Sequence, residues 1–390
     1  MTAILPGSTI GIMGGGQLGR MMTLAARTMG YHVHILDPDP ECAAAPVADE
    51  IITAAFDDVQ AAAELARSCD VVTVEIEKIG IPAMRAAAAY APVRPGAHVL
   101  HVVQDRGRQK RWLSEHGFPV GEFWTADTLD QLRHAAGASD GAELFVKSCA
   151  GGYDGRGQVR LAPGGSPDEA WRLLGANPVI AERGLELQAE ISVLVARTPS
   201  GAVALHPPAL NHHVNGVLDW SVIPAIVHLA TAAEAEALGR RIAEALDVVG
   251  LLAVEMFVLR GGQLVVNELA PRPHNTFHHT ELSCLTSQFE QGIRAVCDLP
   301  LGATDVLRPA AIANLFGDLW LGDEAPPFDT ALKIPGVRVH LYGKQPRAGR
   351  KVGHIGAVGV TEQEAVAKVQ EARALLSTHE HRPAPLHPPG

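Results

Sequence analysis

Short apolar runs and amphipathic stretches alternate over the first hundred residues of the chain. The apolar runs have the length of strands, and the stretches between them repeat their apolar residues at helical spacing. Strands that alternate with helices in this way are typical of a parallel sheet with helices on its faces. Residues 1–103 are therefore predicted to form a doubly wound, Rossmann-like α/β domain. The predicted strands are Thr9–Met13, His32–Leu36, Ile51–Thr53 and Asp70–Val74, and the predicted helices are Leu18–Met29, Asp57–Arg67 and Ala83–Tyr90.

The pattern changes after residue 103, where strands follow one another with fewer helices between them, as in an α+β fold. A basic helix at Asp105–His116 is predicted to begin a second domain over residues 104–305, of which about 118–185 form a subdomain. A small C-terminal domain is predicted over 306–377, and a disordered tail over 378–390. The predicted strands are Phe118–Trp124, Leu144–Lys147, Val159–Leu161, Val179–Glu182, Glu190–Ala196, Ala202–Leu205, Ala311–Leu315, Val337–Tyr342 and Gly353–Val360, and the predicted helices are Leu129–Ala136, Ala232–Leu246, Ser287–Cys297 and Glu362–Leu376, with a turn at Asn211–Gly216.

Two runs rich in β-branched and aromatic residues, Leu251–Leu259 and Gln263–Leu269, flank the pair Gly261-Gly262. This pattern indicates a β-hairpin. With the two glycines as the loop, Glu255 lies directly opposite Glu268. Opposed like charges destabilise a hairpin, and Mg²⁺ takes carboxylate ligands. Glu255 and Glu268 are therefore predicted to bind Mg²⁺; two solvated glutamates on a surface hairpin are the alternative.

The second strand of this hairpin leads into a segment that cannot be regular structure, Ala270–Asn275, because two prolines restrict it. The segment presents Arg272, His274 and Asn275, and Asn267 adds an amide oxygen just before it. These residue types suit an anion or ligand clamp beside the predicted metal site.

A glycine-rich turn follows the first strand, with Gly14, Gly16 and Gly19 in the spacing G-x-G-x-x-G. Such a turn brings backbone N–H groups and a helix N-terminus close to phosphate, and Asp37 after the second strand completes a dinucleotide-binding fingerprint. The same turn holds other ligands, or none, in many doubly wound sheets. Glu75, at the carboxyl edge of the sheet, is predicted to contact hydroxyl or amine groups of a ligand or to cap a helix.

A second glycine-rich segment, Gly151–Gln158, lies between two predicted strands and carries a tyrosine and two charged residues. It is predicted to be a hairpin flap that closes over phosphates, with Lys147 as a point charge and Arg156 as a fork. A flexible surface turn is the alternative. Further along, Lys344, Arg347, Arg350 and Lys351 are predicted to grip a phosphate or to form a solvated charge run.

The formal net charge of −11 argues against non-specific binding to nucleic acid or to anionic membranes. The sequence has no apolar run long enough to span a membrane and no secretory signal. Its five cysteines are scattered, make no metal-binding pattern and suit a reducing cytosol. A cytoplasmic protein that binds neither nucleic acid nor membranes is predicted.

The order of these features resembles the ATP-grasp superfamily and, within it, the N5-carboxyaminoimidazole ribonucleotide synthetase family of de novo purine synthesis. The resemblance runs from about Ile10 to Leu376. It implies an ATP-grasp fold with an N-terminal Rossmann-like domain and a small C-terminal domain, and a homodimer. The motifs that carry it are GGGQLGRMM (Gly14–Met22), QDR (Gln104–Arg106), GGYDGRGQ (Gly151–Gln158), NELAPRPHN (Asn267–Asn275), TSQFEQ (Thr286–Gln291) and HLYGKQPRAGRKVGHI (His340–Ile355).

The resemblance also implies the reaction. ATP, bicarbonate and 5-aminoimidazole ribonucleotide give N5-carboxyaminoimidazole ribonucleotide, ADP and phosphate, by way of carboxyphosphate. Phosphoryl transfer of this kind depends on metal and cationic positioning. ATP and Mg²⁺ are therefore the expected cofactors, and Asp154 is the candidate to accept a proton from the amine.

The same resemblance assigns residues to sites. The implied catalytic residues are Tyr153, Asp154, Arg272 and His274. The implied nucleotide-binding residues are Arg106, Lys147, Gly152, Tyr153, Asp154, Gly155, Arg156, Gly157, Glu182, Arg183, Gly184, Leu185, Glu190, His213, Asn267 and Glu268. The implied substrate-binding residues are Gln17, Leu18, Glu75, Arg156, Arg272, His274, Asn275, Lys344, Arg350 and Lys351.

Three positions depart from the family pattern. Ser148-Cys149-Ala150 follows Lys147 where an arginine is expected two residues after the lysine. Thr276-Phe277 replaces the usual Ser-Gly, and this phenylalanine is expected to crowd the site. Lys78 stands where asparagine is commoner.

Four alternatives to this function remain open. Another ATP-grasp ligase or a specialised paralogue shares most of the features. An NAD-dependent oxidoreductase rests on Gly14–Gly19 and Asp37, and leaves the carboxylate pair and the flap unexplained. A non-catalytic nucleotide binder rests on the altered flap alone.

Overall fold

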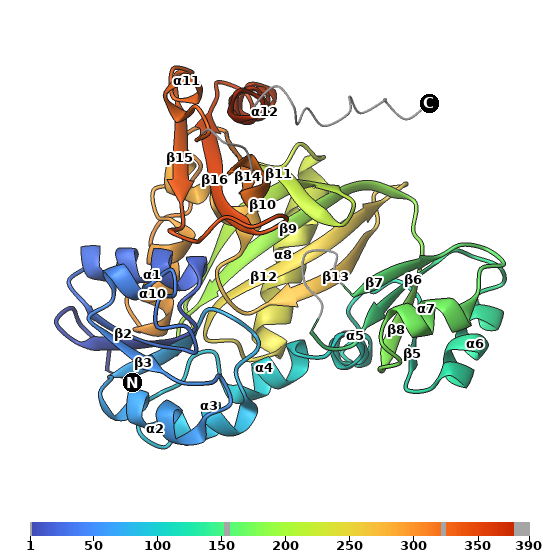
Figure 1. Cartoon of the computed structure of the whole chain (residues 1–390), viewed down its shortest axis with the longest axis horizontal. Helices are drawn as coiled ribbons and strands as arrows, with labels where there is room; N and C mark the ends of the chain where they lie inside the picture. Colours follow the sequence, from blue (N-terminus) through green and yellow to red (C-terminus); the bar gives the residue numbers. More distant parts are fainter. Residues whose placement is uncertain (1, 152–156, 321–324, 378–390) are drawn as a thin grey trace.

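The computed structural model of the chain describes residues 2–151, 157–320 and 325–377, and these residues contain three β-sheets (Figure 1). The predictions for Gly152, Tyr153, Asp154, Gly155, Arg156 and the tail at 378–390 lie outside the described residues. The combination of a parallel sheet with two sheets rich in antiparallel pairs confirms the predicted α/β and α+β class.

The first sheet is parallel. Its elements are β1 (Thr9–Met13), α1 (Gln17–Thr28), β2 (His32–Asp37), the 3₁₀ turn η1 (Ala45–Val47), β3 (Glu50–Thr53), α2 (Val59–Arg67), β4 (Val71–Val74), α3 (Ile81–Ala87) and α4 (Ala97–Val103). The strand order is β3-β2-β1-β4, as in one half of a doubly wound sheet. β4 is buried along its whole length, because helices cover both faces of the sheet. The Rossmann-like prediction is confirmed; α4 was not predicted.

The second sheet has eight strands and forms the centre of the molecule (Figure 1). Its strands are β9 (Leu187–Arg197), β10 (Val203–Val214), β11 (Val217–Ile223), β12 (Gly250–Leu259), β13 (Leu264–Ala270), β14 (Ala310–Phe316), β15 (Val337–Leu341) and β16 (Lys351–Val358). Their order is β13-β12-β9-β10-β11-β14-β16-β15. β11 pairs with β14, so the strands of the predicted C-terminal domain extend the sheet of the middle region. Among its strands, the sequence pattern failed to predict β11.

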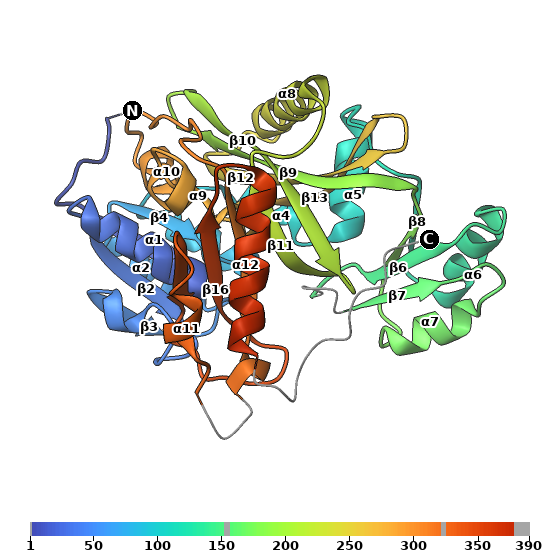
Figure 2. The same cartoon turned by 90° about the horizontal axis from the view of Figure 1, so that it is seen from above.

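The third sheet is small and antiparallel, and it lies to one side of the central sheet (Figures 1 and 2). Its elements are β5 (Phe123–Ala126), α6 (Leu129–Ala138), β6 (Leu144–Ser148), β7 (Gln158–Leu161), α7 (Pro167–Leu173) and β8 (Val179–Arg183), in the strand order β5-β8-β6-β7. The basic helix α5 (Arg106–Glu115) connects this sheet to the first domain. β6 and β7 pair on either side of the glycine-rich segment, as the flap prediction requires.

Helices pack on the central sheet, and their buried side chains form hydrophobic cores with those of the strands. They are α8 (Leu229–Ala245), α9 (Thr280–Ser283), α10 (Gln288–Val296), α11 (Phe328–Ala331) and α12 (Glu362–Leu376), with 3₁₀ turns η2 (Asn275–Phe277) and η3 (Gly317–Trp320). α8 packs closely on β9, since a Cβ atom at Gly239 would lie 2.5 Å from a methyl group of Val193. α12 buries Ala365, Val369 and Ala372 against the C-terminal strands, along which it lies in Figure 2.

The hairpin of β12 and β13 places Glu255 opposite Glu268, as predicted, but by a different register near the turn. Val258 pairs with Leu264 rather than with Val265, because the loop has three residues instead of two. A β-bulge next to Glu255 then restores the predicted pairing. In a regular strand, Asn267 and Glu268 would point to opposite faces. The bulge instead turns Asn267 towards Glu255.

Two other local predictions were wrong. Asn211, His212 and His213 belong to β10 rather than to a turn, which is confined to Asn215 and Gly216. Phe277 does not crowd the site: it is fully buried in an apolar cluster with side chains of the central sheet and α10. Its aromatic ring belongs to the core, and only its neighbour Thr276 faces the polar network described below.

Candidate functional site

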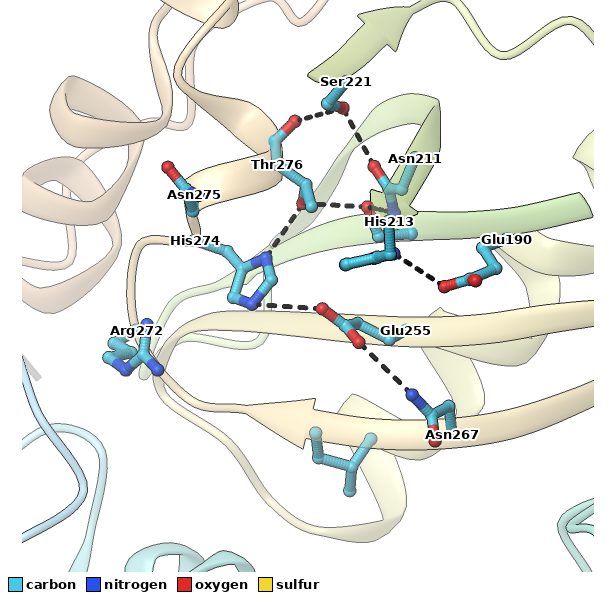
Figure 3. A network of polar contacts seen from close by, with 12 residues as sticks. Glu190, Asn211, His213, Ser221, Glu255, Asn267, Arg272, His274, Asn275 and Thr276 are labelled. Carbon is cyan, nitrogen blue, oxygen red and sulfur yellow. Dashed lines mark hydrogen bonds and ion pairs between the residues drawn. The ribbon is translucent and has the colours of Figure 1, made fainter. Parts of the chain in front are cut away.

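The two carboxylates of the hairpin differ in environment. The side chain of Glu255 is 20 % exposed, whereas Glu268 is open to solvent. Burial and the charge of Glu268 raise the pKa of Glu255 to about 7. Asn267 Nδ2 donates to Glu255 Oε2 at 3.4 Å, and His274 Nε2 lies 3.4 Å from Glu255 Oε1 (Figure 3). The negative charges of the two carboxylates therefore favour the binding of a cation between them.

The clamp segment holds its side chains by contacts on both sides. Arg272 forms a 2.7 Å ion pair with Glu77, which comes from the loop after β4 in the first domain. Although burial disfavours its charged form, Glu77 and the nearby Glu75 raise the pKa of Arg272, so it is cationic. Burial and nearby cations hold the pKa of His274 well below its usual range, so its imidazole is neutral. Arg272 thus offers charge, and His274 offers hydrogen bonds.

A buried hydroxyl network orients His274. His274 Nδ1 lies 2.9 Å from Thr276 Oγ1, which accepts a 2.9 Å hydrogen bond from Ser192. Asn211 and Ser221 extend the network on β10 and β11 (Figure 3). Threonine at 276 carries a hydroxyl, as serine does in the family pattern, and in this chain that hydroxyl contacts His274.

A small pocket opens between the central and the small sheet, and it brings together residues from four elements. It is lined by Arg106, Gln109, Lys110, Lys147, Glu182, Asn267 and Glu268. Lys110 Nζ and Lys147 Nζ bind the two oxygens of Glu182 at 2.8 and 2.5 Å. Burial alone would raise the pKa of Glu182, but the two lysines outweigh it and lower the pKa to about 2. The pocket therefore combines an ionised carboxylate with cations.

Other predicted nucleotide residues lie along the small sheet, β9 and β10. His213 Nδ1 forms a 2.7 Å ion pair with Glu190; burial opposes its charge, yet Glu190 raises the pKa of His213. Arg183 instead points to Glu122, with 2.7 Å between Nε and Oε2. The N–H of Gly184 donates to the carbonyl of Glu143 at 2.8 Å, and Leu185 is half-buried against Gly121. Gly157 accepts a 2.9 Å hydrogen bond from Ser148 N at the base of the flap.

The glycine turn after β1 is already occupied by carboxylates of the chain. Glu75 accepts hydrogen bonds from the N–H groups of Gly16 and Gly19 at 3.0 and 3.1 Å. Asp37 accepts from Gly15 N–H at 2.7 Å. A Cβ at Gly16 would lie 2.7 Å from Glu75 Oε1, which explains the glycine. Carboxylates of the chain itself accept the hydrogen bonds of this turn, which favours the alternative that the turn holds no dinucleotide.

Several of the predicted substrate residues lie near Glu75. Burial raises its pKa, while the turn's N–H groups and the charges of Arg272 and Lys344 oppose the rise. Lys344 Nζ donates to Gln17 Oε1, so the basic segment between β15 and β16 reaches α1. Leu18 is buried in the core of the first domain, and Arg350 Nη1 donates to the carbonyl of Gln345 at 3.1 Å.

The remaining substrate candidates lie nearby in the fold. Asn275 donates to Asn314 Oδ1 at 3.1 Å, and Lys351 begins β16. Lys351 is close enough to lower the pKa of His274. The basic segment and the clamp segment therefore lie close together, and the binding of phosphate by the basic segment stays a prediction.

One further group of potential metal ligands lies in the described part of the chain, at Glu281, His340 and His354. Their ligand atoms lie within 4.8 Å of one another. The two imidazoles, however, are stacked, with 4.5 Å between centroids and 9° between planes. A metal ion lies in the plane of each imidazole that binds it, so these rings cannot share one ion in this arrangement.

Sequence reasoning missed three residues of the site. Lys110 lies in the predicted linker helix, and its place four residues after Arg106, on the same helix face, is the signal that could have found it. The sequence pattern did not indicate that Glu77 would pair with Arg272 or that Thr276 would orient His274. Cys149, in place of the expected arginine, is buried as a small side chain beside α5, with its pKa raised to about 11 by burial.

Models of three protein families match successive parts of the chain. The ribonucleotide synthetase preATP-grasp domain matches residues 7–104, the ATP-grasp domain 111–289, and the phosphoribosylaminoimidazole carboxylase C-terminal domain 310–368. No helix among the described residues is long and apolar enough to cross a membrane.

Similar proteins have one description in common. The N5-carboxyaminoimidazole ribonucleotide synthase of Brucella melitensis is 43 % identical over 91 % of this chain and 97 % of its own. That of Bacillus subtilis is 39 % identical over 94 % of this chain and 95 % of its own.

Solved structures agree with these relatives. A crystal structure of the ADP complex of an N5-carboxyaminoimidazole ribonucleotide synthetase superposes with a TM-score of 0.90 at 40 % identity, over 96 % of this chain and 98 % of that one. The Aspergillus clavatus enzyme, in complex with ADP and 5-aminoimidazole ribonucleotide, has a TM-score of 0.84 at 29 % identity, over 95 % of this chain and 98 % of that one. Together with the fold and the carboxylate pair, these matches show that the chain belongs to the N5-carboxyaminoimidazole ribonucleotide synthase family of ATP-dependent ligases with the ATP-grasp fold.

Proposed function

We propose that this site joins bicarbonate to the exocyclic amine of 5-aminoimidazole ribonucleotide at the expense of ATP. The observation that carries the proposal is the directly opposed pair of Glu255 and Glu268 beside a pocket lined by Arg106, Lys147 and Asn267. Phosphoryl transfer needs a divalent cation and positive charge around the phosphates, and this arrangement supplies ligands for the first and side chains for the second.

In this proposal Glu255 and Glu268 hold Mg²⁺, which neutralises charge on the phosphates of ATP. Carboxylate oxygens are the donors that Mg²⁺ prefers, and the raised pKa of Glu255 indicates a missing counter-charge, so the residues fit the ion. Lys147 and Arg106 contact the phosphates. The backbone of Arg183–Leu185 receives the base, Glu182 borders the site through its ion pair with Lys147, and Glu190 with His213 binds the ribose.

The substrate side is proposed from the residues gathered around Glu75. Lys344, Arg350 and Lys351 bind the 5′-phosphate of the ribonucleotide, and Gln17, Leu18 and Asn275 line the remainder of its site. Lys344 supports this placement most directly, because it is half-buried, is close enough to Glu75 for their charges to interact, and contacts Gln17 across two domains. Arg272 and His274 lie between this region and the carboxylate pair, where the two reactants have to meet.

The proposed chemistry has two steps. An oxygen of bicarbonate attacks the γ-phosphorus of ATP, the bond to ADP breaks, and carboxyphosphate forms. The amine then attacks the carbonyl carbon of carboxyphosphate, or CO₂ released from it; phosphate leaves, and the nitrogen loses a proton to Asp154. Cationic Arg272 stabilises the developing negative charge, and neutral His274 orients the reactant by hydrogen bonding.

The proposal also covers the oligomeric state, the cellular location and the domain boundaries of the chain. The chain is proposed to act as a homodimer in the cytoplasm, with domains at residues 1–103, 104–305 and 306–377 and a tail at 378–390. The matched family models, at 7–104, 111–289 and 310–368, support these boundaries.

The proposed function is tested by measuring phosphate release from Mg·ATP and ¹³C-bicarbonate with and without 5-aminoimidazole ribonucleotide. Release is expected to depend on the ribonucleotide, with one labelled carbamate formed per phosphate. Ribonucleotide-independent release would indicate another acceptor, and ATP binding without release would indicate a nucleotide binder.

Replacing Lys344 by methionine is expected to raise the KM for the ribonucleotide about tenfold or more, while the KM for ATP stays unchanged. The reason is that a charge-assisted hydrogen bond to phosphate contributes roughly 1.5–3 kcal/mol. The matched control is Lys333→Met, at a lysine that is 73 % exposed and paired with surface Asp329. An equal rise in both KM values would show that Lys344 does not bind the ribonucleotide specifically.

Binding of Mg·ADP is expected to release a proton from Glu255. Near neutral pH this residue is partly protonated in the free protein, since its pKa is raised to about 7, and a bound cation favours the carboxylate. Release should approach about one proton as the pH falls to roughly 6 and vanish above about 8.5. Calorimetry in buffers of different ionisation enthalpy measures it.

Two variants make this measurement decisive. Glu255→Gln should abolish the pH-dependent release. Glu281→Gln should leave it intact, although burial raises the pKa of Glu281 to about 7 as well, because Glu281 belongs to α9 and is not a ligand of the proposed metal site. Equal release by wild type and Glu255→Gln would contradict the metal assignment.

A further inference from the structure

Glu182 is shared between two lysines from different elements. Lys110, on α5, binds Oε1 at 2.8 Å, and Lys147, at the end of β6, binds Oε2 at 2.5 Å. All three side chains are largely buried, with exposed fractions of 6 % for Lys110, 19 % for Lys147 and 14 % for Glu182. Lys110 lies just outside the ATP-grasp match at 111–289 and outside the motifs that carry the family resemblance.

The two lysines differ in how firmly they are held. Lys110 Nζ also donates to the carbonyl of Val266 on β13 at 3.0 Å. Its neighbour Gln109 binds both the N–H and the carbonyl of Leu269, at 3.1 and 3.4 Å, so α5 is fixed to the edge of the central sheet. Lys147 is more exposed and lies at the strand end that leads into the flap. Of the two, Lys147 is the one able to turn away from Glu182.

The proposed function, on which this inference rests, requires Lys147 at the phosphates of ATP. If Lys147 moved there and nothing else neutralised Glu182, a carboxylate would remain buried without a partner. An ion left buried in this way costs several kcal/mol. Binding of ATP would then have to overcome that penalty.

We propose that Lys110 is a positioning residue that neutralises Glu182 alone while Lys147 turns from Glu182 to the phosphates of ATP. Glu182 thus holds Lys147 before nucleotide binds and releases it when nucleotide binds. The pKa of about 2 for Glu182 agrees with a carboxylate that stays ionised and needs a permanent cation. Without Lys110, Glu182 would retain Lys147 as its single counter-charge.

The test compares binding of ATP and of adenosine, which lacks phosphates, by calorimetry. In Lys110→Met, ATP affinity is expected to fall about tenfold or more, as for removal of one partner of a coupled buried pair. Adenosine affinity should not change, since Lys147 does not contact the nucleoside in this scheme. A purely structural role of Lys110 would weaken both ligands equally. Lys333→Met is the surface control.

Two further variants test whether Lys110 acts through Lys147. In a Lys147→Met background, Lys110→Met should cause no additional loss of ATP affinity, because no lysine remains to be released. Glu182→Gln alone should increase the preference for ATP over adenosine, and it tests the same idea if Lys110→Met does not fold. A conservative Lys110→Arg variant should keep most of the wild-type preference.

The outcomes distinguish this inference from the proposed function. If Lys147→Met leaves the preference for ATP over adenosine unchanged, Lys147 does not bind phosphate and the proposed nucleotide site is wrong. If Lys147→Met reduces the preference but Lys110→Met does not, the nucleotide site stands and the inference about Lys110 is overturned.

Discussion

The Glu268→Gln variant is expected to lose about 10²- to 10³-fold of ribonucleotide-dependent phosphate release, with no loss of folding stability. Glutamine keeps the shape of the side chain but removes one charge from the proposed metal site, and groups that stabilise transition-state charge have effects of this size. Glu268 is exposed and raises the pKa of buried Glu255 by repulsion. Removing its charge therefore relieves a repulsion in the metal-free protein.

The experiment pairs a phosphate-release assay with denaturant unfolding in the absence of Mg²⁺. The matched control is Glu186→Gln, at a side chain that is 80 % exposed and paired with Arg260 at 3.5 Å near the loop of the same hairpin. This control should keep wild-type activity. A Glu268→Gln protein with activity within threefold of wild type would have lost at most ~0.7 kcal/mol of transition-state stabilisation. That result would exclude the carboxylate pair as the metal site.

The Phe277→Ala variant is expected to lose about 3–5 kcal/mol of folding stability while its KM for the ribonucleotide stays unchanged. Phe277 is fully buried among Leu194, Ala209 and other apolar side chains, and truncation of such a ring leaves a cavity. The ring lies in the core, so its loss should not alter the shape of the substrate site directly.

Denaturant unfolding gives the stability, and kinetics at a temperature where the variant is folded give the KM. Leu332→Ala is the control, since that leucine is 50 % exposed and should change stability by less than about 0.5 kcal/mol. A small loss of stability together with a large fall in KM would show that the phenylalanine does restrict the site.

Local patterns predicted most of the helices and strands of the chain. The spacing of apolar residues and the residues of tight turns can be recognised from neighbours in the sequence. The hairpin is the clearest example. β-Branched runs around Gly261-Gly262 predicted the pairing of Glu255 with Glu268, which the structure confirms, although a three-residue loop and a bulge produce it rather than the predicted two-residue loop. Helix α12 was predicted with its observed bounds for the same reason. Family membership also followed from short motifs and was confirmed by relatives and solved structures.

Contacts between distant segments decided the remainder. The N–H groups of the glycine turn bind Glu75 and Asp37, which lie 59 and 22 residues away from their partners Gly16 and Gly15. The sequence showed the motif, but only the fold showed that carboxylates of the chain already satisfy it. Likewise, β11 joins β14 into one sheet, which no local pattern could indicate.

The sequence alone therefore determined the family, the class of fold and the hairpin that carries the two carboxylates, because these depend on residue type and on short-range spacing. The exact register of the hairpin, with its bulge, was decided by the tertiary structure. The tertiary structure decided which charges meet. Lys110 and Glu182, 72 positions apart in the sequence, form a pair with a separation of 2.8 Å. It also turned Phe277 into the core and, through the bulge, Asn267 towards Glu255. Side-chain direction and charge pairing depend on long-range packing, which the order of residues does not reveal locally.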